Sequence, residues 1–500
     1  MLQENPHAEA QAHPRPSPTR IRLATATAAA AALTAGLVAV SASSASAVTG
    51  VARADADADF NGDGIGDTAV SASHAYVGGH AEAGQIAVVY GGTVSKKYTT
   101  ISQNTAGVPG SAESGDVFGA DSAYGDFNGD GYDDLLVSAP GEDVGSDKDG
   151  GTAAILWGSP SGLTGGTTVA DPRPTKHDGF GGPAEAGDFN GDGKADFAIA
   201  SENGSATVDI FTGPFTRTNT TGRHTTLSAA VHSGDGAGIW NLHSGDANGD
   251  GSDDLIVNGY STETDYNANL WIPGSTSGLS AARSQRLPTG VITDLGDTDS
   301  DGYDDVVIGN FWADSNNKAE SGAVSVVHGT VSGPSAGDTQ KFTQETPGVP
   351  GGSEGGDGFG AEVDLGDVNG DGHLDLVVGT PGEDLTGGAD AGAATVLYGA
   401  ADGSGITGSG ALFLEQNNAY VPNTNEKNDQ FGSDVHLDDL NGDGRDEVYV
   451  GALGENGSNG ALYPVRVNAD GTLASSSGIY TSTLGISATG TPRLGANFTD

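Results

Sequence analysis

Short apolar runs recur along the whole chain, and each one follows a cluster of acidic and amide residues. Three examples are DLLVSA at 134–139, DLIVNG at 254–259 and DLVVGT at 375–380. Runs of this length, bounded by glycine-rich turns, are typical of buried β-strands. A second apolar run follows, such as AAILWG at 153–158, and then a third, such as ALFLEQ at 411–416. The units show no convincing helical period, so the pattern predicts about four strands per unit.

The acidic clusters are copies of one nine-residue loop that precedes the first apolar run of each unit. Every copy has an acidic or amide side chain at positions 1, 3, 5 and 9, and position 6 is always glycine, which permits the positive φ of a sharp turn. The copies recur at intervals of 51 to 72 residues, which indicates a repeat architecture. The seven loops are residues 59–67, 126–134, 188–196, 246–254, 297–305, 367–375 and 439–447.

Hard oxygen ligands at this spacing suit Ca²⁺, which takes about six to eight oxygens in flexible geometry. Position 7 varies in residue type, as expected if its backbone carbonyl is the ligand and its side chain is not needed. We therefore expect up to seven Ca²⁺ ions per chain. The expected ligands at positions 1, 3, 5, 7 and 9, in loop order, are Asp59, Asn61, Asp63, Ile65, Asp67; Asp126, Asn128, Asp130, Tyr132, Asp134; Asp188, Asn190, Asp192, Lys194, Asp196; Asp246, Asn248, Asp250, Ser252, Asp254; Asp297, Asp299, Asp301, Tyr303, Asp305; Asp367, Asn369, Asp371, His373, Asp375; and Asp439, Asn441, Asp443, Arg445, Glu447.

Loops of this composition have two other interpretations. An EF-hand needs a glutamate at position 12 and a following helix. Here position 12 is Val or Ile in every copy, inside a predicted strand, which excludes the EF-hand. Asx-rich turns that hold no ion would explain a single copy, but seven copies with the same gaps favour a metal loop.

The charge and cysteine content agree with this interpretation. The chain of 500 residues has 67 acidic and 20 basic residues, a formal net charge of −47. Nucleic acid is therefore not an expected partner, because neutralising phosphates requires Lys and Arg. The excess of negative charge repels itself in a compact fold, so bound cations would offset it. There is no cysteine, so metal ions replace disulfides as the expected cross-links.

The N-terminal segment has the pattern of a secretion signal. Basic residues precede an alanine-rich apolar run at 23–40, and small residues follow up to Ala47. We predict a signal peptide over 1–47 and a mature chain of 48–500. A membrane anchor is the alternative, but the cleavage-site pattern favours a signal. No later stretch is long and apolar enough to span a bilayer. The expected location is extracellular, either secreted or loosely associated with the cell surface.

A Phe-Gly pair stands just before four of the loops, with its glycine seven residues ahead of position 1. The pairs are Phe118-Gly119, Phe180-Gly181, Phe359-Gly360 and Phe431-Gly432. Turns such as SAPGED at 138–143 follow the first apolar run. Together these features resemble the FG-GAP repeat of the N-terminal β-propeller of integrin α subunits, over nearly all of 48–500. The resemblance implies an all-β, seven-bladed β-propeller. Each blade would be a four-stranded antiparallel sheet with a calcium loop between its first two strands.

Three places depart from the repeat. Where Phe-Gly belongs, the fourth copy has Gly238-Ile239-Trp240 and the fifth has Thr289-Gly290, so their first strands should pack unusually. The first copy lacks the pair altogether, while Leu494-Gly495 near the other end looks like an eighth copy. Since a propeller must join its last blade to its first, we expect residues 494–498 to pair into the first blade. They would lie beside residues 51–54 or replace them.

Most aromatic residues occupy repeated positions and are expected to pack between blades. Tyr260, Phe311 and Trp312 instead fall in corresponding loops of the fourth and fifth blades. The resemblance places partner binding on this edge, opposite the calcium loops. We predict that these three residues bind a sugar or a protein; the alternative is that they fold back onto the blades.

No catalytic constellation emerges. A Gly-x-Ser-x-Gly motif at 351–355 lacks the strand and helix of a nucleophile elbow, so Ser353 is expected to be a loop residue. His328 shares a strand-end position with Tyr90 and Tyr398 and is expected to be structural. We predict a non-enzymatic, monomeric, calcium-binding module for extracellular binding or adhesion to a protein or glycan. A polysaccharide hydrolase or lyase is the alternative, and a role in a cell-surface layer is a third possibility.

Overall fold

The structure is a computed structural model, and it describes residues 58–92, 97–176, 179–201, 205–234, 238–261, 267–474 and 476–499. All of them belong to one compact unit, residues 50–500. The predicted signal peptide at 1–47 and the candidate closing segment at 51–54 lie outside the described residues.

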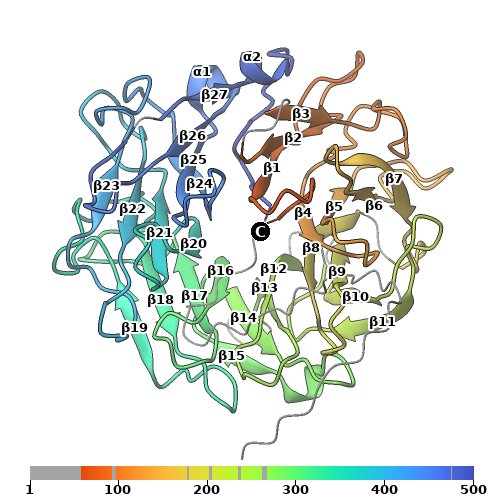
Figure 1. Cartoon of the computed structure of the whole chain (residues 1–500), viewed down its shortest axis with the longest axis horizontal. Coiled ribbons are helices and arrows are strands. Elements are labelled where there is room, and N and C mark those ends of the chain that lie inside the picture. The colour runs from red at the N-terminus through yellow and green to blue at the C-terminus, as the bar shows by residue number, and fades with distance from the viewer. Residues whose placement is uncertain are drawn as a thin grey trace, which may run out of the picture. The chain divides into compact units, whose positions relative to one another are not determined.

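The described residues form seven antiparallel sheets arranged as the blades of a propeller (Figure 1). Six sheets have four strands in sequence order, and the first has three. The blades are, in order, β1 (Asp67–Ala72), β2 (Gln85–Tyr90), β3 (Tyr98–Ile101); β4 (Ser122–Gly125), β5 (Asp134–Ala139), β6 (Thr152–Trp157), β7 (Thr164–Val169); β8 (Phe180–Gly187), β9 (Asp196–Ser201), β10 (Thr207–Thr212), β11 (Arg223–Ser228); β12 (Ile239–Gly245), β13 (Asp254–Tyr260), β14 (Asn267–Ile272), β15 (Gln285–Leu287); β16 (Ile292–Gly296), β17 (Asp305–Asn310), β18 (Ala323–Val327), β19 (Thr339–Phe342); β20 (Val363–Gly366), β21 (Asp375–Thr380), β22 (Ala393–Leu397), β23 (Leu412–Leu414); and β24 (Phe431–Asp438), β25 (Glu447–Ala452), β26 (Ala461–Val465), β27 (Ile479–Tyr480).

The predicted fold class, an all-β propeller of seven blades, is confirmed. In every blade the strand after the acidic loop begins at position 9 of that loop, from Asp67 in β1 to Glu447 in β25. In blades 2 to 7 the loop therefore joins the first and second strands, as expected. The helices are single turns: η1 (Ala281–Arg283), α1 (Glu455–Ser458) and α2 (Thr481–Leu484).

The hydrophobic core lies between neighbouring blades. Between blades 2 and 3, Phe127, Phe180, Phe197 and Phe211 are buried together, and the rings of Phe197 and Phe211 stack with centroids 4.8 Å apart. Each blade is thin, so it buries its two faces only by packing against its neighbours. The aromatic residues at third-strand ends pack between blades, as predicted.

Ring closure uses the C-terminal residues. Phe498 pairs antiparallel with Val70 of β1, on the side of β1 away from β2. Two backbone hydrogen bonds flank this bridge: Ser71 donates to Asn497 over 2.8 Å, and Thr499 donates to Ala69 over 3.0 Å. The innermost place of blade 1 is thus filled from the other end of the chain, and the predicted pairing of the C-terminal segment is confirmed.

Leu494 also behaves as the predicted eighth copy of the repeated phenylalanine. It bridges Gly460 in parallel, as Phe431 bridges Gly392 one blade earlier. None of the helices in the described part of the chain is long and apolar enough to cross a membrane.

Candidate metal loops and an aromatic surface

Each acidic loop folds around the carboxylate of its first residue. In blade 2 the Asp126 carboxylate accepts hydrogen bonds from the backbone N–H groups of Gly129, Asp130 and Gly131, over 2.7, 3.0 and 2.9 Å. Gly131, at position 6, has a φ of 86°, which an L-residue rarely adopts. The loop glycine that the sequence singled out is therefore required by the backbone conformation.

The residue at position 9 lies at the buried end of the loop. In blade 2 the Asp134 carboxylate accepts a bond from Asn128 Nδ2 over 2.9 Å and one from the Gly158 N–H over 2.8 Å. Burial raises the pKa of six position-9 carboxyls, since the charged form loses its hydration, and nearby loop carboxylates raise it further. The pKa rises to about 7 in Asp67, Asp134, Asp254 and Glu447, to about 6 in Asp196 and to about 8 in Asp375.

The donor set of these loops fits a hard divalent cation. Carboxylates at positions 1, 5 and 9 and an amide or carboxylate at position 3 surround one turn of backbone. In the fifth loop one oxygen from each of Asp297, Asp299 and Asp301 lies within 4.8 Å of the others. Oxygens that each lie about 2.4 Å from one Ca²⁺ ion are at most about 4.8 Å apart. The raised pKa values also favour a cation site, because a bound cation would offset the repulsion between the neighbouring carboxylates of each loop.

Protein cations already approach some loops. In blade 5, His328 Nδ1 lies 3.3 Å from Asp305 and 3.6 Å from Asp299. The nearby Asp305 carboxylate raises the pKa of this histidine. The sequence predicted only a structural role for His328, because the strand-end position does not show that the side chain turns toward the loop. In the register of the paired strands, His328 lies opposite Asp305, the ninth residue of its loop. Tyr90 lies opposite Asp67 in the same way in blade 1.

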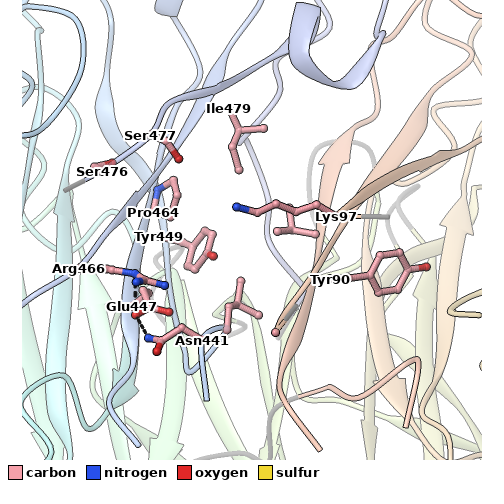
Figure 2. Close-up of a pocket in the computed structure, with 13 residues that line it drawn as sticks. Tyr90, Lys97, Asn441, Glu447, Tyr449, Pro464, Arg466, Ser476, Ser477 and Ile479 are labelled. Carbon is pink, nitrogen blue, oxygen red and sulfur yellow. Dashed lines mark hydrogen bonds and ion pairs between the residues drawn. The ribbon is translucent and has the colours of Figure 1, made fainter. Parts of the chain in front are cut away.

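Two arginines lie against the acidic residues of the seventh loop. Arg466 Nε lies 3.4 Å from Glu447, and an Arg445 guanidinium nitrogen lies 2.9 Å from Asp443. Figure 2 shows Arg466 and Asn441 meeting at Glu447, on the wall of a cavity of about 670 Å³ between blades 7 and 1. Lys97 of blade 1 reaches into the same cavity from the other side. A metal ion in this loop would have to compete with these guanidinium groups.

Adjacent loops are tied to one another by residues at position 8, which the sequence did not single out. In blade 2 the Asp133 carboxylate accepts the backbone N–H of Asp59 in the first loop over 2.8 Å. The Asp133 N–H donates to the Asp59 carbonyl over 3.1 Å. Three other pairs of loops share this arrangement; the acceptors there are Asp253, Asp304 and Asp446. The loops therefore form part of the contact between blades.

The three predicted ligand-binding aromatics come together on the edge opposite the acidic loops. Tyr260 ends β13, and Phe311 and Trp312 follow β17. Trp240, near the start of β12, joins them: its ring centroid lies 4.4 Å from that of Tyr260 and 6.2 Å from that of Trp312. The Phe311 and Trp312 centroids are 4.6 Å apart. We call these four residues the aromatic cluster. All four are partly exposed.

The Gly-x-Ser-x-Gly motif and a small acidic cavity are the places where catalysis could be sought. The 351–355 motif lies in the connection between β19 and β20, so Ser353 is a loop residue, as predicted. A cavity of about 60 Å³ lies among the innermost strands, lined in part by Asp121, Glu185 and Asp434. That volume accommodates about four or five water molecules. The Asp434 carboxylate there accepts the Phe498 N–H over 2.9 Å.

Comparisons with known proteins agree with the fold. The FG-GAP repeat model matches residues 118–156, 359–397 and 431–463, and the FG-GAP-like repeat model matches residues 188–257. No curated protein matches the chain in sequence.

Among solved structures, the rhamnogalacturonan lyase YesW is similar over 87% of this chain and 69% of its own, at 12% identity and a TM-score of 0.24. A score this low supports no inference about activity. Four stretches of the chain thus match FG-GAP repeat models, and the described residues fold into a seven-bladed β-propeller, as in the N-terminal domains of integrin α subunits.

Proposed function

We propose that this protein is a secreted, monomeric propeller that binds calcium in its seven acidic loops and recognises an extracellular glycan through the aromatic cluster. The observation that carries the binding function is the cluster itself. Four large rings from two neighbouring blades, partly exposed, lie on the edge away from the loops. Rings of this kind offer apolar faces to a sugar and polar tips to its hydroxyls.

The two edges of the propeller have different roles in this proposal. The acidic loops bind Ca²⁺, which offsets the net charge of −47 and fixes the blades in register. The opposite edge is then a rigid surface for the ligand, since the aromatic side chains stand at strand ends rather than on long loops.

The double substitution Trp312→Ala and Tyr260→Ala is expected to weaken glycan binding at least about tenfold, because these rings flank Trp240 at the centre of the cluster. The melting temperature should fall by only a few degrees, since aromatic pairs contribute about 0.5–1.5 kcal/mol beyond their burial. A glycan array in CaCl2 identifies the ligand, and calorimetric titration compares the variants.

Tyr420→Ala is the matched control, because Tyr420 is 66% exposed and lies outside the cluster. It should leave affinity unchanged. If the double variant binds as tightly as the wild-type protein, the aromatic cluster is not the ligand site. A third outcome is that no glycan binds, that an extracellular protein does, and that the double variant fails to bind this protein. The aromatic cluster would then still be the binding site, but its ligand would be a protein rather than a glycan.

A further inference from the structure

A second group of acids lies on the edge opposite the acidic loops, in blade 6. Glu354 and Asp357 stand in the connection between β19 and β20, and Glu383 follows β21. One carboxylate oxygen from each lies within 4.8 Å of the other two. Asp357 and Glu383 are 1% and 5% exposed, whereas Glu354 is exposed. Three carboxylates thus converge at a site that is buried on one side and open to solvent on the other.

A buried amide points at these acids and is only half satisfied. Gln344 is 5% exposed, and its Nε2 lies 2.6 Å from Glu383 Oε2. Its Oε1 is buried and has no hydrogen-bond partner among the described residues. A buried polar atom without a partner is costly. The matching amide oxygens of Gln103 in blade 2 and Gln416 in blade 7 are buried without a partner in the same way, so the carboxylates, and not this oxygen, distinguish blade 6.

Blade 7 contains the same constellation in a closed form. Glu455 corresponds to Glu383 and accepts Gln416 Nε2 over 2.6 Å. It also accepts Asn423 Nδ2 over 2.9 Å and the Tyr463 hydroxyl over 3.1 Å. Three neutral donors therefore surround this one carboxylate.

Blade 6 has different residues at the two extra donor positions. Gly351 stands in the place of Asn423, and Thr395 stands in the place of Tyr463, as the strand registers show. A Cβ at Gly351 would lie 2.8 Å from Gln344 Nε2, so the glycine keeps the space beside the amide open. Blade 2 has the same three acids, Glu113, Asp116 and Glu142, but within the described residues only blade 6 brings its three carboxylates this close.

The charge around the blade 6 group favours a cation. Burial raises the pKa of Asp357 to about 6 and that of Glu383 to about 7, and the other carboxylates of the group raise them further. The charge of exposed Lys318 reaches Asp357, but no ion pair joins this lysine to the three acids in the described part of the chain.

We propose that Glu354, Asp357 and Glu383 bind one further Ca²⁺ ion, with the Gln344 amide beside it. The spacing of the carboxylate oxygens matches oxygens that share one Ca²⁺ ion. The exposed side at Glu354 leaves coordination positions for water or a ligand hydroxyl. The site adjoins the aromatic cluster, because a Cβ at Gly358 would lie 3.6 Å from Phe311 Cβ. It is separate from the seven loops and does not depend on their function.

Crystals of the wild-type protein grown in CaCl2 and exchanged into TbCl3 test the proposal directly. The expected result is an anomalous difference peak between Glu354, Asp357 and Glu383. Peaks at the acidic loops without one here would overturn this proposal and leave the loop sites standing. A peak between these three carboxylates without peaks at the acidic loops would support this site and overturn the proposal that the loops bind calcium.

Calcium counting with point variants gives a second test. Glu383→Gln should retain one Ca²⁺ fewer per chain than the wild-type protein after gel filtration in low-millimolar CaCl2, measured by elemental mass spectrometry. Glu455→Gln is the matched control in blade 7 and should lose none. An unchanged count in folded Glu383→Gln contradicts the proposal. If that variant fails to fold, the wild-type crystals decide the question.

Discussion

Chelation with EDTA is expected to lower the melting temperature of the propeller by about 20 °C or more, the largest effect that the proposed function implies. Each ion present at about one hundred times its dissociation constant adds about 2.7 kcal/mol to the free energy of unfolding, so seven independent loops add about 19 kcal/mol. That exceeds the total stability of an ordinary domain, about 5–15 kcal/mol. Calorimetric melts in EDTA and in excess CaCl2 measure the difference. Identical midpoints would remove calcium from the account.

The pH dependence of the same melts provides an internal control. Without metal, position-9 carboxyls such as Asp134 and Asp375 have raised pKa values, about 7 and 8. Their favourable contribution is complete below the unfolded pKa near 4 and is lost as pH rises through the folded values. Stability in EDTA should therefore fall between about pH 4 and 8. In calcium it should rise over the same range, because the ion competes with protons for the carboxylates. Parallel slopes in the two buffers would contradict a metal role for position 9.

Deleting residues 490–500 is expected to open the ring between blades 1 and 7. The deletion removes Leu494 and Phe498, which are 0% and 3% exposed, from a core cluster that contains residues of both blades. It also exposes the inner edge of β1, which then offers unpaired backbone groups to another chain. Truncating a buried Leu or Phe costs about 2–5 kcal/mol each. The truncated protein should aggregate or melt well below the wild-type protein, even in calcium.

Phe498→Ala is the milder test of the same contact. The Phe498 ring stacks on His436 with centroids 5.8 Å apart and meets Tyr449 edge-on at 6.3 Å, so its loss should cost about 3–5 kcal/mol. Val331→Ala is the control, since Val331 is 75% exposed. Size-exclusion chromatography and thermal melts compare the three proteins. A monomeric truncated protein with an unchanged melt would show that another segment seals the ring.

The repeat architecture could be predicted from sequence because its signals are local. Position 9 begins the strand that follows the loop in every blade, from Asp67 to Glu447, since the same loop and the same apolar run adjoin in each copy. The closing segment was predicted with an alternative left open, residues 51–54. Local sequence patterns cannot show which of the two segments pairs with the edge of β1. The pairing found in the structure joins Val70 to Phe498, which are more than 400 residues apart in the sequence.

The sequence did not predict the individual side-chain contacts that join separate parts of the chain. Asp133 bonds to a loop 74 residues away, and no pattern within one repeat reveals that partner. Trp240 was noted only as a departure from Phe-Gly, although it lies between Tyr260 and Trp312. The blade 6 acids likewise come from separate connections, joined to Gln344 only by the folding of the blade.

The number of calcium ions that the folded protein retains tests the central claim most directly. The protein is stripped with EDTA, reloaded in low-millimolar CaCl2, passed through gel filtration in the same buffer, and analysed by elemental mass spectrometry against protein concentration. The account predicts about seven ions per chain from the acidic loops, or eight with the blade 6 site, and none after EDTA. A folded, reloaded protein that retains fewer than one ion per chain would contradict it.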